Sequence, residues 1–168
     1  MVAWLTIDDT NIDYPVMQSN DNTKYLNTDP YGNYSLSGSI YLDFRNNPQF
    51  TDNYSLIYGH HMEYGKMFGA LDNFLKKDYM ESHKKGKLIV GRNSDKVYDL
   101  EVFAAMKVSA KEKNIFEPDK NDDRYKKFIK KNSLIYRLEK DYRILALSTC
   151  KSVESDERTV VFCYILDD

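Results

Sequence analysis

The sequence predicts a mainly β protein in which about eight short strands form a closed or nearly closed barrel, with two or three helices at its periphery. Short runs rich in aromatic, β-branched and aliphatic residues follow one another, and clusters of Asp, Asn, Gly and Pro separate them. Only two segments have helical spacing. The length of 168 residues and the 42% hydrophobic content suit one domain, over residues 1–168, with a sizeable core.

Each predicted strand is a short apolar run that turn residues bound. Asp8-Asp9-Thr10-Asn11 separates the first two runs, and Asn46-Asn47-Pro48 and Gly91-Arg92-Asn93-Ser94 precede later ones. In chain order, strands are expected over residues 4–7, 12–16, 39–42, 54–58, 87–90, 97–107, 143–147 and 159–166. A sandwich of two sheets is the competing arrangement of these strands.

The two segments with helical spacing lie between predicted strands. From Met67 onward, apolar residues recur at i, i+4 and i+7, which predicts one buried face of a helix over about residues 66–83. The apolar residues around Phe128 are flanked by lysines, as in a short amphipathic helix. Any of Asn121-Asp122-Asp123 could cap this second helix.

Charge and hydropathy narrow the function classes. The 24 basic and 26 acidic residues give a net charge of −2, so there is no electrostatic reason to expect nucleic acid as a partner. No apolar run approaches the roughly 18 residues of a membrane span, and Met1 does not begin a signal-peptide pattern. The chain as given is expected to be soluble. It opens almost directly on a strand, as an excised catalytic region would.

The last part of the chain places a cysteine and an arginine where nucleophilic sulfur chemistry needs them. The apolar strand over residues 143–147 delivers Cys150 to its tip, and Arg158 begins the next apolar run. The thiolate is the reactive form of cysteine, and a nearby permanent cation favours it. Cys163 lies inside an apolar run and is expected to be a small buried hydrophobe. A Cys150–Cys163 disulfide is the alternative in an oxidising compartment, and it would consume the nucleophile.

A base for this thiol is present in Tyr58-Gly59-His60-His61. Gly59 ends an apolar strand and is expected to make a tight bend that lets the histidine project into a cleft. Alone, such a histidine is more often structural. A strand-end cysteine, a strand-end histidine and the strand-start Arg158 could nevertheless all reach one rim of a barrel.

Metal chemistry is not expected, and neither is a cofactor. The neighbours His60 and His61 cannot easily both face one ion from a strand, and no Cys-x-x-Cys or His-x-x-x-His spacing occurs. No clustered acidic loop of the calcium-binding kind stands out. His83 lies among charged residues at a helix end and is expected to be a solvated surface residue.

Several segments match the motifs of one family. They are Ile12-Asp13-Tyr14-Pro15-Val16, Asp21-Asn22 with Tyr25-Leu26, Ile57-Tyr58-Gly59-His60-His61-Met62 with Met67-Phe68, and Leu147-Ser148-Thr149-Cys150 with Arg158. The chain is similar over nearly its whole length to the sortases, cell-wall transpeptidases of Gram-positive bacteria, and most similar to class B. The resemblance implies an eight-stranded sortase-type barrel with the active site in a groove on its wall. It also implies a helix in the insertion over residues 110–136, before the cysteine strand.

Matched residue by residue, the resemblance implies roles for individual side chains. Cys150 would be the nucleophile, His60 the acid and base, and Arg158 the group that positions the substrate or holds the oxyanion. His60 is preferred over His61 because the family's histidine directly follows the glycine. Ala146 stands where the family has threonine, so a hydroxyl is missing near the groove. The residues matching sorting-signal contacts are Asn22, Leu26, Ile115, Ser148 and Thr149.

The implied reaction consists of two acyl transfers. The cysteine attacks the Thr carbonyl in a C-terminal sorting signal of a secreted protein and forms a thioacyl-enzyme. An amine of a peptidoglycan precursor then takes the acyl group. The sorting-signal peptide and this amine are therefore the expected partners. The N-terminal helices and membrane span usual in class B are absent here, so action at the extracellular face of the cell membrane would depend on an anchor that this chain lacks.

Two other functions compete with this interpretation. A Cys/His wall peptidase or amidase would use water where a sortase uses an amine. Such families often place the cysteine before the histidine and at a helix N-terminus, whereas here the histidine comes first and Cys150 ends a strand. A non-enzymatic alternative is an aromatic-rich barrel that binds wall peptide or glycan, since the chain has 14 tyrosines and eight phenylalanines.

Overall fold

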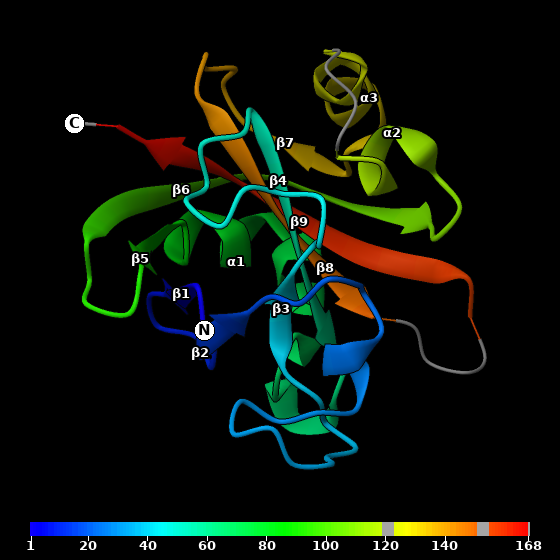
Figure 1. Cartoon of the computed structure of the whole chain (residues 1–168). Coiled ribbons are helices and arrows are strands. Elements are labelled where there is room, and N and C mark those ends of the chain that lie inside the picture. Colours follow the sequence, from blue (N-terminus) through cyan, green and yellow to red (C-terminus); the bar gives the residue numbers. More distant parts are fainter. Residues whose placement is uncertain (119–122, 151–154, 168) are drawn as a thin grey trace.

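A computed structural model describes residues 1–118, 123–150 and 155–167 of the chain (Figure 1). The strands are β1 (Ala3–Ile7), β2 (Asp13–Met17), β3 (Ile40–Leu42), β4 (Tyr54–His60), β5 (Lys85–Val90), β6 (Lys96–Ser109), β7 (Ile135–Tyr136), β8 (Arg143–Cys150) and β9 (Glu157–Leu166). The helices are the 3₁₀ helices η1 (Lys24–Leu26), η2 (Glu63–Gly65) and η3 (Gly69–Leu75), and the α-helices α1 (Lys77–Ser82), α2 (Lys113–Phe116) and α3 (Arg124–Asn132).

Eight of these strands close into a barrel. Their order is β5-β1-β2-β3-β4-β8-β9-β6, and the ring closes because β5 pairs with β6 as well as with β1. The ninth strand, β7, adds to β6 at Ala104 and Ala105. The predicted eight-stranded closed barrel is confirmed, and the alternative of a two-sheet sandwich is wrong.

All eight predicted strands are present, with ends within three residues of those expected. Two of the differences concern the site: β4 continues through Gly59 and His60, and β8 continues to Cys150. The strand β7 was not predicted, because two residues carry too little pattern. The histidine and the cysteine therefore belong to the strands themselves and not to the loops that follow them.

The predicted tight bend at Gly59 is wrong. A Cβ atom at this position would lie 2.3 Å from Cδ1 of Ile40 and 2.8 Å from the ring of Phe68. Glycine is required here because β4 passes so close to these side chains, and not because the backbone turns. This close contact fixes the path of the strand immediately before His60.

Inward-facing side chains form the main core, which η3 and α1 complete. The prediction of one helix over residues 66–83 is only partly right, because extended backbone at Lys76 separates η3 from α1. The predicted apolar face does point inward, since Leu71 and Phe74 are fully buried.

Two expectations at the helix ends also change. His83 is partly exposed at the end of α1, and its ring also stacks on Tyr79, with the ring centroids 3.8 Å apart. The helix expected after residues 121–123 is present as α3, and Asp123 occupies the position before it without a capping hydrogen bond from its side chain. The other two proposed caps, Asn121 and Asp122, lie outside the described residues.

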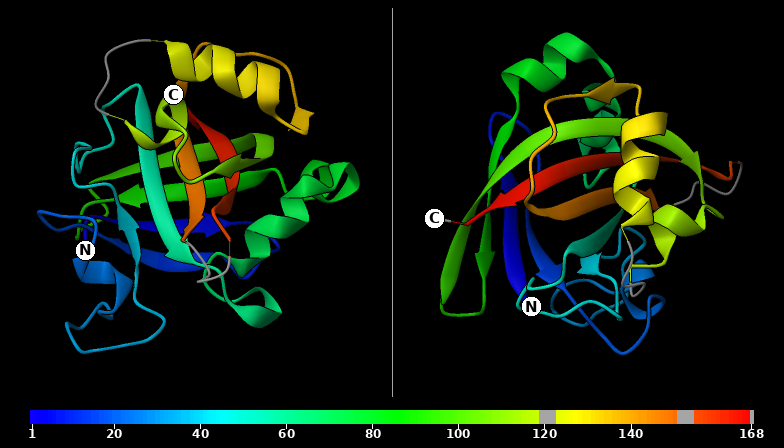
Figure 2. Two further views of the ribbon diagram at one scale, coloured as in Figure 1. Left: turned by 90° about the vertical axis from the view of Figure 1, so that its right-hand side faces the viewer. Right: turned by 90° about the horizontal axis from the view of Figure 1, so that it is seen from above.

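Two covers lie on the outer face of the barrel wall. A second core, which we call the outer core, includes residues of β4, β8 and β9 and lies beneath α2 and α3. Figure 2 shows these two helices against the outside of the barrel. A smaller cluster, which includes Tyr25 of η1 and Tyr41 of β3, lies nearby. Tyr58 of β4 packs against both clusters. The end of β4 that follows Tyr58 therefore lies between the two covers.

A buried carboxylate ties both covers to the wall. Asp43, whose side chain is fully buried, accepts two hydrogen bonds of 2.8 Å from the guanidinium of Arg45. It also accepts from Nδ2 of Asn22 at 2.9 Å and from the hydroxyl of Tyr58 at 3.1 Å. Arg45 Nη2 donates in addition to the Phe116 carbonyl oxygen at 2.9 Å. Burial alone would raise the pKa of Asp43, but hydrogen bonds from Arg45 and Asn22 and the charge of Arg45 lower it.

The lowered pKa of Asp43 predicts a pH dependence of stability. Because the folded-state pKa lies below the unfolded value of about 3.9, the stabilisation is present above that pH and is lost as the pH falls through the folded-state pKa. Asp43→Asn should lower the free energy of unfolding at pH 7 by about 1–3 kcal/mol and should weaken this acid dependence. Urea unfolding between pH 7 and pH 3 measures both effects. An identical acid dependence in variant and wild type would contradict the prediction.

Candidate active site

Three neighbouring strands bring the candidate residues into one row. β4 and β8 run parallel, and their register pairs His60 with Cys150. β8 and β9 run antiparallel, with Ser148 opposite Val160. Arg158 lies two positions before Val160 in β9, and its side chain reaches the carbonyl oxygen of Thr149, the residue before Cys150. Residues that are far apart in the sequence therefore occupy adjacent positions on three strands.

The row lies on the outer face of the wall. Side chains in a strand alternate between the two faces, so positions two apart share a face. In each of the three strands, the alternate positions next to the row belong to the outer core. These residues are Tyr54 and Leu56 in β4, Ile144 and Ala146 in β8, and Val160 and Phe162 in β9.

His60 is half-buried, and a backbone carbonyl holds its ring. Nε2 lies 2.6 Å from the carbonyl oxygen of Leu26, the last residue of η1. A carbonyl oxygen can only accept a hydrogen bond, so Nε2 carries the hydrogen, and Nδ1 is the acceptor in the neutral ring. The chain after β4 folds back onto His60, whose carbonyl oxygen accepts a hydrogen bond from the Phe68 N–H at 2.9 Å.

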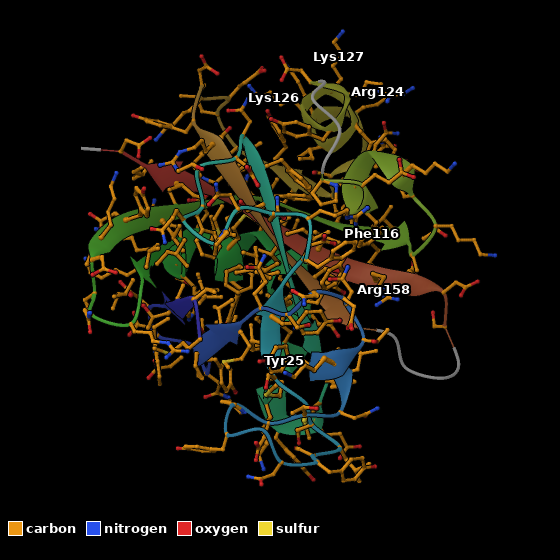
Figure 3. All side chains as sticks on the ribbon, viewed as in Figure 1. Tyr25, Phe116, Arg124, Lys126, Lys127 and Arg158 are labelled. Atoms are coloured by element: carbon orange, nitrogen blue, oxygen red, sulfur yellow. The ribbon has the colours of Figure 1, made fainter. Side chains whose placement is uncertain are left out.

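Arg158 is half-buried at the start of β9. Its Nη1 donates to the carbonyl oxygen of Thr149 at 3.0 Å, which holds the guanidinium against the peptide bond that joins Thr149 to Cys150. Its Nε is buried and has no hydrogen-bond partner among the residues that the structure describes. In the view of Figure 3, Arg158 lies between Phe116 of α2 and Tyr25 of η1.

Two of the residues matched to peptide contacts support the site from the η1 side. Asn22 has both ends of its amide engaged: Nδ2 donates to Asp43, and Oδ1 accepts from the Phe44 N–H at 3.0 Å. Leu26 is half-buried and holds the ring of His60 through its carbonyl oxygen. Leu26 therefore lies beside His60, whereas Asn22 belongs to the polar network of Asp43, which also binds Tyr58.

The other three matched residues have buried side chains. Ile115 is fully buried in the outer core, and its carbonyl oxygen accepts from the Tyr54 hydroxyl at 3.0 Å. Ser148 and Thr149, adjacent to the row on β8, are buried as well. Ile115 and Ser148 therefore pack within the wall, whereas Thr149 also borders a cavity beside Arg158. The resemblance located them by position in the sequence, which does not report burial.

Ala146, where a hydroxyl near the groove was expected to be missing, lies in the core of the wall. Ala146 does share a face of β8 with Ser148, but it is fully buried in the outer core. Its methyl group packs within the wall. Substitution at this position therefore changes the core and not an exposed part of the site.

A second polar cluster, which the sequence analysis did not identify, borders Arg158. The carboxylate of Asp72 lies between His61 and Thr159, and it accepts from the Thr159 hydroxyl at 2.6 Å. The three residues border a cavity of about 240 Å³ together with Arg158 and Thr149. Nothing in the local pattern marks Asp72, because only the apolar face of its segment carries a periodic signal.

Cys163 is a free thiol that is fully buried in β9. Burial raises its pKa to about 12, because charging a thiol away from water is unfavourable. The residue therefore stays a neutral thiol at physiological pH and packs as the small buried hydrophobe that was predicted. The Cys150–Cys163 disulfide considered as an alternative is not formed.

Within residues 1–118, 123–150 and 155–167, no group of three or more His, Cys, Asp or Glu side chains is arranged to hold a metal ion. In the same described ranges, every helix is too short or too polar to cross a membrane.

The comparisons with known proteins point to one family. A family model described as the sortase domain matches residues 5–166. Sortase B of Staphylococcus aureus is 34% identical over 175 residues, which cover 99% of this chain and 70% of that protein. A class B sortase of Streptococcus pyogenes involved in pilus biogenesis, Spy0129, superposes with a TM-score of 0.89 at 38% identity, covering 98% of this chain and 91% of that one.

A Staphylococcus aureus sortase B–substrate complex superposes with a TM-score of 0.88 at 32% identity, covering 99% of this chain and 79% of the other. The family model, the sequence identity and the superpositions extend over nearly the whole described barrel, including the three strands that carry the row. The chain therefore belongs to the sortase family of transpeptidases and is most similar to its class B members.

Proposed function

We propose that this sortase cleaves a C-terminal sorting signal of a secreted protein at a Thr carbonyl and transfers the acyl group to an amine of a peptidoglycan precursor. The observation that carries the proposal is the row of His60, Cys150 and Arg158 across β4, β8 and β9. The row combines a nucleophile, an acid–base group and a permanent cation within one stretch of wall.

In the first half-reaction, the Cys150 thiolate attacks the Thr carbonyl carbon, and the new C–S bond leaves negative charge on the carbonyl oxygen. As the carbonyl re-forms, the C–N bond breaks, and the departing amine takes a proton from the His60 imidazolium. In the second half-reaction, the acceptor amine attacks the thioacyl carbon and gives its proton to His60. The C–S bond then breaks, which regenerates the thiolate and leaves a new amide.

The contact between His60 and Leu26 indicates which ring nitrogen exchanges the proton. Nε2 is occupied by the Leu26 carbonyl oxygen at 2.6 Å, and that bond persists whether the ring is neutral or charged. The mobile proton therefore belongs to Nδ1. The Leu26 carbonyl thus acts on the reaction by orienting the ring.

Arg158 supplies a permanent positive charge. Because Nη1 already holds the Thr149 carbonyl oxygen, the guanidinium is oriented before substrate arrives. Its remaining N–H groups can bind the oxyanion or a backbone carbonyl of the substrate. Either contact stabilises the charge that develops when the thiolate attacks.

The proposal also covers the setting of the reaction. Sorting signals and peptidoglycan precursors meet at the outer face of the cell membrane, so we assign the enzyme to that surface. Residues 1–168 would then act as one catalytic domain.

Cys150→Ala should abolish cleavage of a sorting-signal peptide and leave the thermal unfolding midpoint unchanged, because the variant lacks the nucleophile but keeps the strand pairing. Incubating the wild type with the peptide, with and without a nucleophilic amine, tests the acceptor. A ligated product is expected with the amine present. Hydrolysis alone would favour the peptidase alternative, and turnover by the variant would remove Cys150 as nucleophile.

His60→Ala should reduce turnover by about 10²–10⁴-fold, because no other group in the row can donate and accept the proton. His61→Ala is the matched control, since His61 is the next residue and lies outside the row; it should keep more than a tenth of wild-type turnover. Steady-state kinetics with the same peptide distinguish the two variants. The reverse ranking would assign the proton transfer to His61.

Arg158→Lys should lower kcat/KM by about 10²-fold or more, because an ammonium cannot hold the Thr149 carbonyl oxygen and the substrate with one planar group. Arg137→Lys is the matched control. Arg137 is half-buried like Arg158, but it pairs with the carboxylates of Glu81 and Glu101 and lies outside the row. Near-wild-type kinetics for Arg158→Lys would reduce Arg158 to a structural charge.

A further inference from the structure

The side chains around Asp72 connect three elements of the site. Asp72 belongs to η3, and its carboxylate is about half exposed, at 47%. Oδ2 lies 2.7 Å from Nε2 of His61, which directly follows β4. Oδ1 accepts from the hydroxyl of Thr159, the third residue of β9, at 2.6 Å. One carboxylate thus joins the end of β4 to the beginning of β9.

Thr159 lies where side chains take part in holding β8 and β9 together. The register of the two strands runs from Arg143 opposite Ile165 to Ser148 opposite Val160. One position further, the Thr159 N–H donates to the side-chain hydroxyl oxygen of Thr149 at 3.1 Å. A side-chain oxygen therefore serves here as the acceptor for a strand N–H.

The residue next to Thr159 is Arg158. The side chain of Arg158 donates to the Thr149 carbonyl oxygen, and the backbone N–H of Thr159 donates to the Thr149 hydroxyl oxygen. Both residues therefore bind Thr149 of β8. The place of the guanidinium along the row consequently depends on where the beginning of β9 lies. Asp72 is the group outside β8 that holds Thr159 through a side chain.

We propose that Asp72 is a positioning residue of the transpeptidase. By holding the Thr159 hydroxyl, it fixes the beginning of β9 and sets the Arg158 guanidinium relative to His60 and Cys150. This inference rests on the proposed function. Misplacement of a catalytic group by about 1 Å can cost about 10²-fold in rate, so a single hydrogen bond to a neighbouring residue can have a large effect.

The position of Asp72 separates this role from a purely structural one. Its carboxylate faces the same cavity of about 240 Å³ as Arg158, and water can reach it there. Losing the Thr159 bond therefore leaves no buried charge without a partner. The fold should tolerate the change, whereas the geometry of the row should not.

The test compares substitutions at both ends of the Asp72–Thr159 bond. Asp72→Ala and Thr159→Val should each lower kcat for peptide cleavage by about tenfold or more, with KM changed less than threefold. Thr159→Ser keeps the hydroxyl and should restore most of kcat. Asp99→Ala is the matched control, because Asp99 is an exposed acceptor of a 2.7 Å bond from Lys87 outside the site; its kinetics should match wild type.

A double-mutant cycle identifies the group that Asp72 positions. In the Arg158→Lys background, adding Asp72→Ala should lower the remaining kcat by less than twofold, because the guanidinium to be positioned is gone. A further loss of tenfold or more in that background would overturn the proposal. So would an unchanged kcat in Asp72→Ala, or a loss of kcat in step with a lowered unfolding midpoint in the absence of substrate.

The experiments distinguish a failure of the positioning role from a failure of the proposed function. If the wild type does not cleave a sorting-signal peptide, or if Cys150→Ala still cleaves it, the proposed function fails. If the wild type cleaves and Cys150→Ala does not, but Asp72→Ala behaves as wild type, the positioning role alone fails.

Discussion

The hydrogen-bonded register of β4, β8 and β9 is the constraint on which the site depends. It places three residues, separated by up to 98 positions in the chain, in one row across the barrel wall. Because side chains alternate along a strand, a slip of one residue would move a member of the row to the inner face. Barrel closure opposes such a slip, since β4, β8 and β9 each have a paired strand on both sides.

Strand pairing positions the backbones of the row, and backbone carbonyl oxygens orient the side chains of His60 and Arg158. The Leu26 carbonyl oxygen holds the ring of His60, and the Thr149 carbonyl oxygen holds the guanidinium of Arg158. The buried Asp43 in turn joins Tyr58 of the wall to Asn22 on one cover and, through Arg45, to α2 on the other. In this wall of paired strands, a carbonyl oxygen of η1 orients His60, and a carbonyl oxygen of the neighbouring strand β8 orients Arg158.

The strands and the chemical identity of the row were predictable from the sequence, because both leave local patterns. Apolar runs between turn residues located all eight barrel strands, and Cys150 and Arg158 were recognised at a strand tip and a strand start. Predictions that depended on distant contacts were less successful. Gly59 was expected to bend the chain, whereas it is required by the side chains of Ile40 and Phe68, which lie elsewhere in the sequence.

The same limit applies to helices and to buried residues. A periodic apolar face correctly predicted that Leu71 and Phe74 point inward, but it could not indicate that the backbone is extended at Lys76. The resemblance to sortases gave Ile115 a place beside the substrate, and the packing of α2 on the outer core buries it. Burial is a property of the assembled layers, so neither periodicity nor position in a motif reports it.

Residue types and local patterns were sufficient to predict a β-barrel, and to suggest a candidate nucleophile, two candidate histidine bases and a permanent cation. The assembled fold supplied the rest: that His60 and not His61 pairs with Cys150, that Leu26 orients the ring, and that Asp72 touches the residue next to Arg158. These relations join residues tens of positions apart, and they exist only once β4 and β8 lie parallel with the loops closed over them. Local sequence encodes what each residue can do chemically, whereas distances between remote residues arise from the closure of the barrel and the packing of its covers.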